Sequence, residues 1–293
     1  WFPAFAGRTG NRKGKLGALK ELIQFIKELR SCRYDLVIDF HGLFKSSLLV
    51  LLTQAPRKLG FDSMQELSGL FVNEKIPEDM GKHAITRYLD FIRYLDQNSA
   101  VLSDSYEAEM IEFLIPVGAE EERKIIALLK LHGLEGRKFV AVNPVAFWET
   151  KLWTDIKFAQ LCDLIADKFK ASIIFTGTEK GDINRIQARM RHPAVNMAGE
   201  TSLRELACLY RKAALVITTD SGPMHIAAAV GTPVVALFGP TDPARTGPYG
   251  KNHRVVRRDI SCSPCFLKRC ATQECMRQIE VEEVFQAVAS LLI

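Results

Sequence analysis

The sequence lacks several features that define other protein classes. Its 293 residues contain no apolar run that approaches the roughly 20 residues of a membrane-spanning helix. They show no zinc-finger spacing and no RNA-binding aromatic signature, and a net charge of +5 is mild, so we expect no nucleic-acid partner. No Gly-x-Ser-x-Gly turn surrounds Ser221, which argues against a serine hydrolase.

We expect no secretion signal at the start of this sequence. Trp1-Phe2-Pro3-Ala4 is followed within a few positions by Arg8, Arg12, Lys13 and Lys15, with no apolar stretch between them. This basic segment is Gly-rich. It can contact phosphates and carboxylates, since one Arg binds two oxygens at once, or it can simply be solvated.

Seven cysteines fall into two groups. Cys32, Cys162 and Cys208 are scattered and are typical of small buried apolar residues. The other four have the spacing C-x2-C-x4-C-x4-C, at Cys262, Cys265, Cys270 and Cys275. Structural zinc, an iron–sulfur centre and reduced thiols are all compatible with this spacing, so we assign no metal ligand.

Short apolar segments alternate with amphipathic helical segments from residue 118 onward. We predict strands at 138–143, 172–176, 195–197, 215–218 and 234–238, and helices near 120–131, 154–169, 182–191 and 202–212. This alternation is typical of parallel strands joined by helical crossovers. Ligands of such sheets bind at the carboxyl ends of the strands, where polar and glycine residues collect in this sequence.

The run from Thr218 to His225 predicts a strand-to-helix turn that binds an anion. An apolar strand ends here, Ser221 or Asp220 can cap a helix, and Pro223 suits its first turn. The free N–H groups at Ser221 and Gly222 favour a phosphate or carboxylate, and His225 would face the same position. The alternative is a plain cap beside an ordinary half-buried histidine.

Three other segments accompany this run: Gly239-Pro240-Thr241-Asp242-Pro243, Tyr249-Gly250 and Lys151-Leu152-Trp153. Together they resemble the bacterial ADP-heptose:lipopolysaccharide heptosyltransferases, a glycosyltransferase family. Residues 39–46 and 83–87 resemble the N-terminal half of the family, and they favour the member that adds the first heptose. The resemblance runs from about Asp39 to the C-terminus.

The resemblance implies an α/β fold of the GT-B class, with two Rossmann-like, doubly wound parallel-sheet domains facing a cleft. We predict an incomplete acceptor-side domain over residues 1–117 and a donor domain over residues 118–293. A C-terminal helix, marked by apolar residues from Val281 to Leu292, is expected to cross back to the first domain. The length and the 47% apolar content suit two separate cores.

Family members open with a strand and a Gly-Asp turn that this sequence does not show. We therefore expect the chain to be N-terminally truncated and to lack the proposed catalytic base, an Asp after that strand. Asp39 also follows a predicted strand, over residues 34–38, but it matches a later motif. It is interpreted as local structure or as part of the acceptor side.

The implied activity is inverting transfer of L-glycero-D-manno-heptose from ADP-heptose to the Kdo region of lipopolysaccharide, without a metal or other cofactor. Negative charge grows on the leaving diphosphate, so Lys151 and the helix start at Ser221 and Gly222 are predicted to stabilise it. Without the resemblance, Lys151 would be an exposed loop lysine. The alternatives are another acceptor or nucleotide sugar, and a nucleotide-binding module without catalysis.

The resemblance distributes the remaining contacts over both domains. Glu179 is assigned to the ribose hydroxyls, and its alternative is a glutamate in the first turn of a helix. Thr201 is assigned to the adenine and Asp220 to a heptose hydroxyl. His225 and Thr241 are assigned to the same donor site. Lys45, Arg8 and Arg12 are assigned to an anionic lipid A–Kdo acceptor. We expect a cytoplasmic protein that attaches peripherally to the inner face of the inner membrane.

Overall fold

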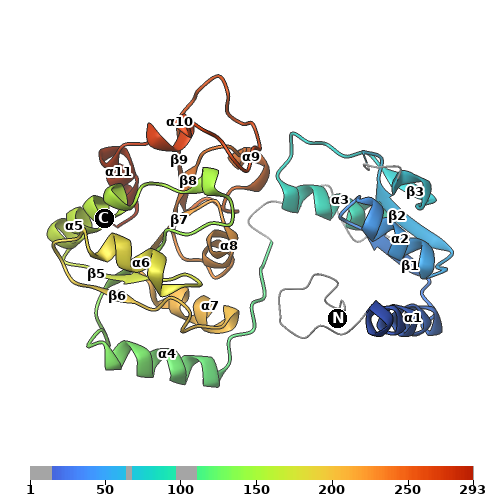
Figure 1. Ribbon diagram of the computed structural model, residues 1–293, viewed down its shortest axis with the longest axis horizontal. Helices are drawn as coiled ribbons and strands as arrows, with labels where there is room; N and C mark the ends of the chain where they lie inside the picture. The colour runs from blue at the N-terminus through green and yellow to red at the C-terminus, as the bar shows by residue number, and fades with distance from the viewer. Residues whose placement is uncertain (1–14, 64–67, 97–110, 293) are drawn as a thin grey trace. The chain divides into compact units, whose positions relative to one another are not determined.

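Strands and helices alternate along the residues that the structure describes, which are 15–63, 68–96 and 111–292 (Figure 1). In this computed structural model every strand pair of those ranges is parallel. The chain divides into two compact units, Trp1–Leu102 and Ser103–Ile293. This division falls before residue 117, where the sequence predicted the boundary. Phe113 belongs to the second unit, and its ring contacts that of Tyr249 at a centroid distance of 5.8 Å.

The first unit is a three-stranded parallel sheet with helices. Its elements are α1 (Lys15–Ser31), β1 (Leu36–Asp39), α2 (Phe44–Leu52), β2 (Arg57–Phe61), η1 (Ser68–Leu70), β3 (Glu74–Ile76) and α3 (Ala84–Asp96), with strand order β1-β2-β3. Leu59, Phe61, Ile76 and Phe91 form its buried core. The apolar side chains of β2 and β3 thus pack on α3.

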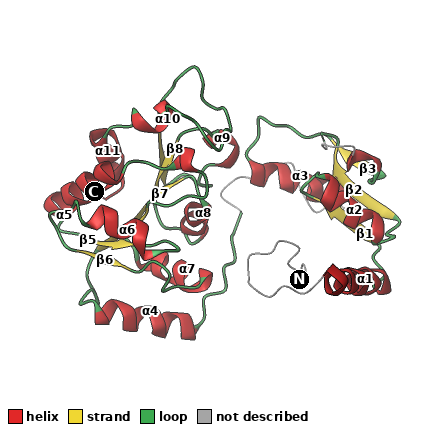
Figure 2. Cartoon of the chain, viewed as in Figure 1, coloured by secondary structure: helices red, strands yellow, loops and turns green. Residues whose placement is uncertain are grey.

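The second unit is a six-stranded parallel sheet with helices on both faces. Its strands are β4 (Phe139–Asn143), β5 (Ser172–Phe175), β6 (Ala194–Asn196), β7 (Leu215–Thr219), β8 (Val234–Phe238) and β9 (His253–Arg257), in the order β6-β5-β4-β7-β8-β9. Its helices are α4 (Ala119–Leu131), η3 (Glu149–Lys151), α5 (Asp155–Phe169), α6 (Lys180–Gln187), α7 (Leu203–Lys212), α8 (Gly222–Ala229), α9 (Pro243–Thr246), α10 (Glu274–Arg277) and α11 (Val281–Leu292). Figure 2 shows the helices around the strands.

Alternate strand residues of this sheet enter two separate cores. Val140 and Val142 belong to the core under α5, α6 and α11, whereas Phe139 and Ala141 belong to the core under α4, α7 and α8. Each of these strand residues is at most 2% exposed. Strands buried on both faces lack polar alternation, which is why the apolar runs were readable as strands of a doubly wound sheet.

Local signals fix the helix ends near the predicted positions. At α7, the Ser202 N–H donates to Glu205 Oε2 at 2.7 Å and the Ser202 hydroxyl accepts from the Glu205 N–H at 3.4 Å, which is a capping box. After α8, Gly231 has φ +79° and the Thr232 N–H donates to the Ala227 carbonyl at 3.1 Å. This left-handed turn ends the helix, and glycine adopts it without steric cost.

The predicted C-terminal helix is present as α11, and it packs against α5 and β9 of its own unit. Its crossing to the first unit stays a prediction. None of the helices in the described ranges is long and apolar enough to cross a membrane.

Candidate functional site

The loops that follow β4 to β8 meet at the carboxyl-end edge of the second sheet. Backbone and side-chain bonds tie neighbouring loops together: the Gly199 N–H donates to the Gly177 carbonyl at 2.9 Å, and the Thr219 hydroxyl donates to the Val145 carbonyl at 3.2 Å. The Asp220 N–H donates to Leu237 of β8 at 3.1 Å. The predicted ligand edge is therefore one connected surface.

Lys151, Asp220 and Thr241 are in direct contact at this edge. The Lys151 ammonium lies 2.6 Å from Asp220 Oδ2, and the Thr241 hydroxyl donates to the same oxygen at 2.6 Å. The side chains of Lys151 and Asp220 are 15% and 6% exposed, and Thr241 is 5% exposed. A buried carboxylate needs such partners, and the cluster brings together residues from three loops.

The turn of η3 places Lys151 beside an aromatic ring. Thr150 is buried and its hydroxyl donates to the Leu267 carbonyl at 2.7 Å, while the Lys151 ammonium lies 4.5 Å from the centroid of the Trp148 ring. Further along, Trp153 is 3% exposed and its Nε1–H donates to the Ile279 carbonyl at 3.0 Å. Contacts on both sides thus hold the lysine toward Asp220.

The start of α8 lies directly after Asp220 and is open. Ser221 occupies the N-cap position, but its hydroxyl bonds the Thr219 carbonyl and the Thr218 hydroxyl, each at 3.3 Å, and makes no capping bond. The helix therefore starts where the sequence predicted it, but the Ser221 side chain does not cap it, because strand groups compete for the hydroxyl. A Cβ placed on the exposed Gly222 would meet no atom within 4 Å, so there is open space beside the first residue of α8. His225 lies on the first turn and is exposed.

Glu179 and Thr201 lie farther along the same edge. Glu179 is exposed at the N-cap of α6, after β5, and Thr201 is half-buried after β6. In the strand order, β5 and β6 lie two and three positions from β7. Because neighbouring strands are about 4.8 Å apart, the ends of β5 and β6 that lead to these residues lie roughly 10 and 14 Å along the edge from the end of β7.

The candidate acceptor residues lie in the first unit. Lys45 is exposed near the start of α2. Arg8 and Arg12 lie outside the described residues. A further position in this unit, Asp39, is 4% exposed, and its carboxylate accepts four hydrogen bonds. The donors are the N–H groups of His41 and Gly42 and the hydroxyls of Ser46 and Ser47, so Asp39 organises the turn into α2, which agrees with its interpretation as local structure.

The four clustered cysteines lie in the segment between β9 and α11. Cys262 is exposed, Cys265 and Cys270 are half-buried and Cys275 is buried. Within the ranges that the structure describes, no group of three or more His, Cys, Asp or Glu side chains is arranged to hold a metal ion. Burial raises the pKa of the Cys275 thiol.

Cys270 is expected to be alkylated at a lower pH than an ordinary cysteine. The Gln273 N–H points at its sulfur at 3.4 Å, and this bond with the nearby Thr272 hydroxyl lowers the pKa of the thiol. A lowered pKa means that more thiolate, the reactive form, is present near pH 7. Iodoacetamide labelling at pH 6.5 to 8, read by peptide mass spectrometry, should modify Cys270 before Cys262. Cys162 provides the control, because burial raises its pKa and it should stay unlabelled. Equal rates at Cys270 and Cys262 across this range would contradict the prediction.

Sequence reasoning did not find Trp148 and Thr150. Trp148 contacts Lys151, and Thr150 joins η3 to a segment more than 100 residues later in the chain. For Trp148, the available signal was its position three residues before Lys151. No local pattern predicts the role of Thr150.

The chain matches the model of glycosyltransferase family 9 (heptosyltransferase) over residues 22–276. It belongs to this family. The matched range contains both parallel sheets and the Lys151–Asp220–Thr241 cluster.

Among its curated relatives is the lipopolysaccharide core heptosyltransferase OpsX of Haemophilus influenzae, which is 27% identical over 252 residues. The match covers 81% of this chain and 66% of that protein. Among solved structures, the family 9 glycosyl transferase of Veillonella parvula is 23% identical and superposes with a TM-score of 0.77, covering 96% of this chain and 80% of that one.

Escherichia coli heptosyltransferase WaaC, solved with ADP-2-deoxy-2-fluoro heptose, is 23% identical with a TM-score of 0.66, covering 95% of this chain and 78% of that chain. These likenesses and the two units with parallel sheets confirm the predicted α/β fold of the GT-B class.

Proposed function

We propose that the chain transfers L-glycero-D-manno-heptose from ADP-heptose to the Kdo region of the lipopolysaccharide core. The observation that carries this proposal is the Lys151–Asp220–Thr241 cluster beside the open N-terminus of α8. It combines a cation and free N–H groups for a phosphate with a carboxylate for a sugar hydroxyl. The lipopolysaccharide core relative and the ADP-heptose analogue in the WaaC structure support the same substrates.

The layout of the edge suits an elongated nucleotide sugar. Thr201 and Glu179, on the loops after β6 and β5, would contact the adenine and the ribose. The diphosphate would lie at Gly222 and Lys151. The heptose would then reach Asp220, Thr241 and His225, so the ligand follows the strand ends toward β8.

The reaction is a displacement at the anomeric carbon. The acceptor hydroxyl attacks from the face opposite ADP, the bond from carbon to the diphosphate oxygen breaks, and the configuration inverts. Negative charge grows on the leaving ADP, where Lys151 and the α8 N-terminus stabilise it. The proton of the hydroxyl passes to a base other than Asp39, whose carboxylate already accepts four hydrogen bonds.

The acceptor side of the proposal rests on positive charge in the first unit. Lys45 on α2, together with Arg8 and Arg12, would contact the phosphates and carboxylates of lipid A–Kdo. Peripheral attachment at the inner face of the cytoplasmic membrane follows from such an acceptor, since its lipid part stays in the bilayer.

A transfer assay tests the proposal with the full chain. Incubation with ADP-heptose and lipid A–Kdo should release ADP and raise the acceptor mass by one heptose, whereas UDP-glucose and GDP-mannose should give no product. Asp220→Asn should reduce transfer by about tenfold or more, because it weakens a charge-assisted hydrogen bond to the sugar. Calorimetric ADP binding without transfer would favour the alternative, a nucleotide-binding module. Absence of both would overturn the proposal.

A further inference from the structure

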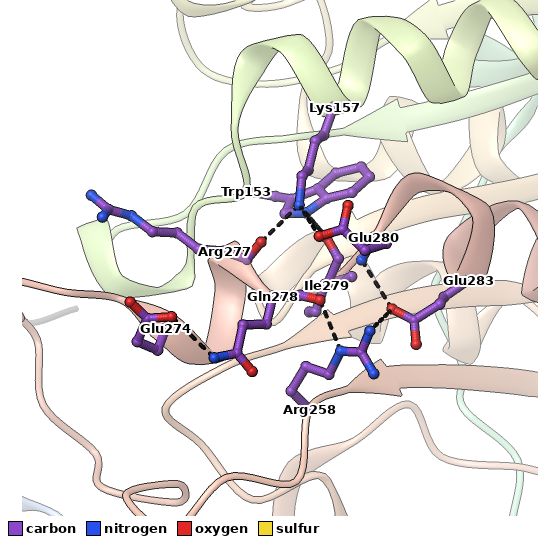
Figure 3. A network of polar contacts seen from close by, with 9 residues as sticks. All are labelled: Trp153, Lys157, Arg258, Glu274, Arg277, Gln278, Ile279, Glu280 and Glu283. Carbon is purple, nitrogen blue, oxygen red and sulfur yellow. Dashed lines mark hydrogen bonds and ion pairs between the residues drawn. The ribbon is translucent and has the colours of Figure 1, made fainter.

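The segment 258–273, here called the cysteine loop, joins β9 to α10 and is fixed at both ends. At its start, Arg258 Nε–H donates to the Gln278 carbonyl at 2.8 Å and its guanidinium lies 2.7 Å from Glu283 Oε2 (Figure 3). Just after its end, the Lys157 ammonium donates to the carbonyls of Arg277 and Ile279, both at 2.7 Å. Both ends of the loop are therefore held at the same segment, residues 277–283.

The middle of the cysteine loop is attached to the candidate donor site. The N–H groups of Cys265 and Phe266 donate to the Pro240 carbonyl at 2.9 and 2.8 Å, and the Ser263 hydroxyl donates to the Gly239 carbonyl at 2.6 Å. Pro240 directly precedes Thr241 of the charged cluster. On the other side, the Leu267 carbonyl accepts from Thr150, the residue before Lys151.

Lys268 follows these attachment points and reaches the same ring as Lys151. Its ammonium lies 5.5 Å from the centroid of the Trp148 ring, and the Lys151 ammonium lies 4.5 Å from it. Lys268 is exposed. An exposed lysine on an aromatic face contributes only about 0.5–1 kcal/mol, so packing on Trp148 is a weak reason for this placement.

The charges of the cluster indicate a different role. Lys151 is paired with Asp220 at 2.6 Å, so the carboxylate offsets part of the positive charge that Lys151 presents to an incoming anion. The start of α8 contributes only about half a positive charge. Additional positive charge would stabilise a departing diphosphate further, and Lys268 is a cation that the fold holds at the same aromatic ring as Lys151.

We infer that Lys268 is a second cationic contact for the diphosphate of the donor, carried into the site by the cysteine loop. This inference rests on the proposed function, because it assumes that ADP-heptose binds at this edge. The loop is then one wall of the donor site, and the Trp148 ring contacts both lysine ammonium groups.

Calorimetry on the full chain with ADP and with adenosine tests the inference. Lys268→Ala should weaken ADP binding by about tenfold, because one charge-assisted contact is lost, and should leave adenosine binding within about twofold. The salt dependence of ADP binding should also become shallower. Lys268→Arg should keep most of the affinity, since it keeps the charge.

Lys212→Ala is the matched control, because it removes the same charge from an exposed position at the far end of α7. It should bind ADP as the wild type does. If Lys268→Ala binds ADP normally while the wild type binds ADP, this inference alone is wrong. If it loses adenosine and ADP equally, the role is structural and the inference is also wrong. If the wild type binds no ADP, the proposed function fails and the inference fails with it.

Discussion

Replacing Lys151 with methionine is expected to lower kcat/KM for heptosyl transfer by about 10²–10³-fold, the range found for removing one transition-state donor. The substitution keeps most of the length of the side chain but removes the ammonium that lies 2.6 Å from Asp220 and 4.5 Å from the Trp148 ring centroid. In the proposed mechanism, the leaving diphosphate then loses one of its cationic partners and keeps the α8 N-terminus and Lys268. Steady-state release of ADP from ADP-heptose measures the effect.

Lys124→Met is the matched control for this variant. Lys124 pairs with Glu205 at 2.9 Å on the surface between α4 and α7, and its side chain is 48% exposed. Exposed pairs of this kind contribute little, so activity should stay within about twofold of the wild type. A Lys151→Met protein with unchanged kcat/KM would remove Lys151 from the mechanism.

The same variant should also be less stable, for a separate reason. Without Lys151, the buried Asp220 carboxylate retains the Thr241 hydroxyl as a donor but loses its counter-ion. Breaking a buried ion pair by removing one partner is costly, because a charge is left uncompensated. The double variant Lys151→Met, Asp220→Asn should recover stability but not activity, which separates the two effects.

Most of the second sheet was predictable because its strands are buried on both faces. The predicted strands at 138–143 and 234–238 are β4 and β8, and each lies within about one residue of its predicted ends. The edge strand β9 was missed. Its sequence, His253-Arg254-Val255-Val256-Arg257, is polar at both ends and partly exposed, so it lacks the continuous apolar run that marks a central strand.

In the candidate site, the local features were predictable from the sequence, whereas the contacts between distant segments were not. Asp220 and the start of α8 follow from the order of residues in one strand-to-helix turn, and the resemblance added Lys151 and Thr241. That Lys151 and Thr241 meet on a single oxygen of Asp220 is a result of the strand order, which places the ends of β4, β7 and β8 side by side. The approach of Lys268 to Trp148 depends on how a long loop returns over the sheet edge, and no periodicity or spacing encodes it.

Trp153→Ala is expected to lower the free energy of unfolding of the second unit by about 3–5 kcal/mol. The indole is 3% exposed and packs edge-on against Phe158 at a centroid distance of 5.0 Å, so alanine would leave a cavity in the core under α5 and α11. The Ile279 carbonyl would also lose the Nε1–H donor at 3.0 Å. Urea denaturation followed by circular dichroism measures the loss.

Two other aromatic variants show whether the ring volume or the hydrogen bond matters more. Trp153→Phe keeps much of the volume and should cost clearly less than Trp153→Ala, because the remaining penalty is one lost hydrogen bond at the Ile279 carbonyl, which still accepts from the Lys157 ammonium at 2.7 Å. Trp148→Ala makes the same truncation at a half-buried ring and should change the urea midpoint little while weakening ADP binding, since both lysines lose their contact. Equal midpoints for Trp153→Ala and the wild type would contradict the prediction that Trp153 anchors the Ile279 segment, to whose carbonyl its Nε1–H donates. A lower midpoint with weaker ADP binding would connect that anchor to the site, because the Ile279 segment fixes the end of the loop that carries Lys268.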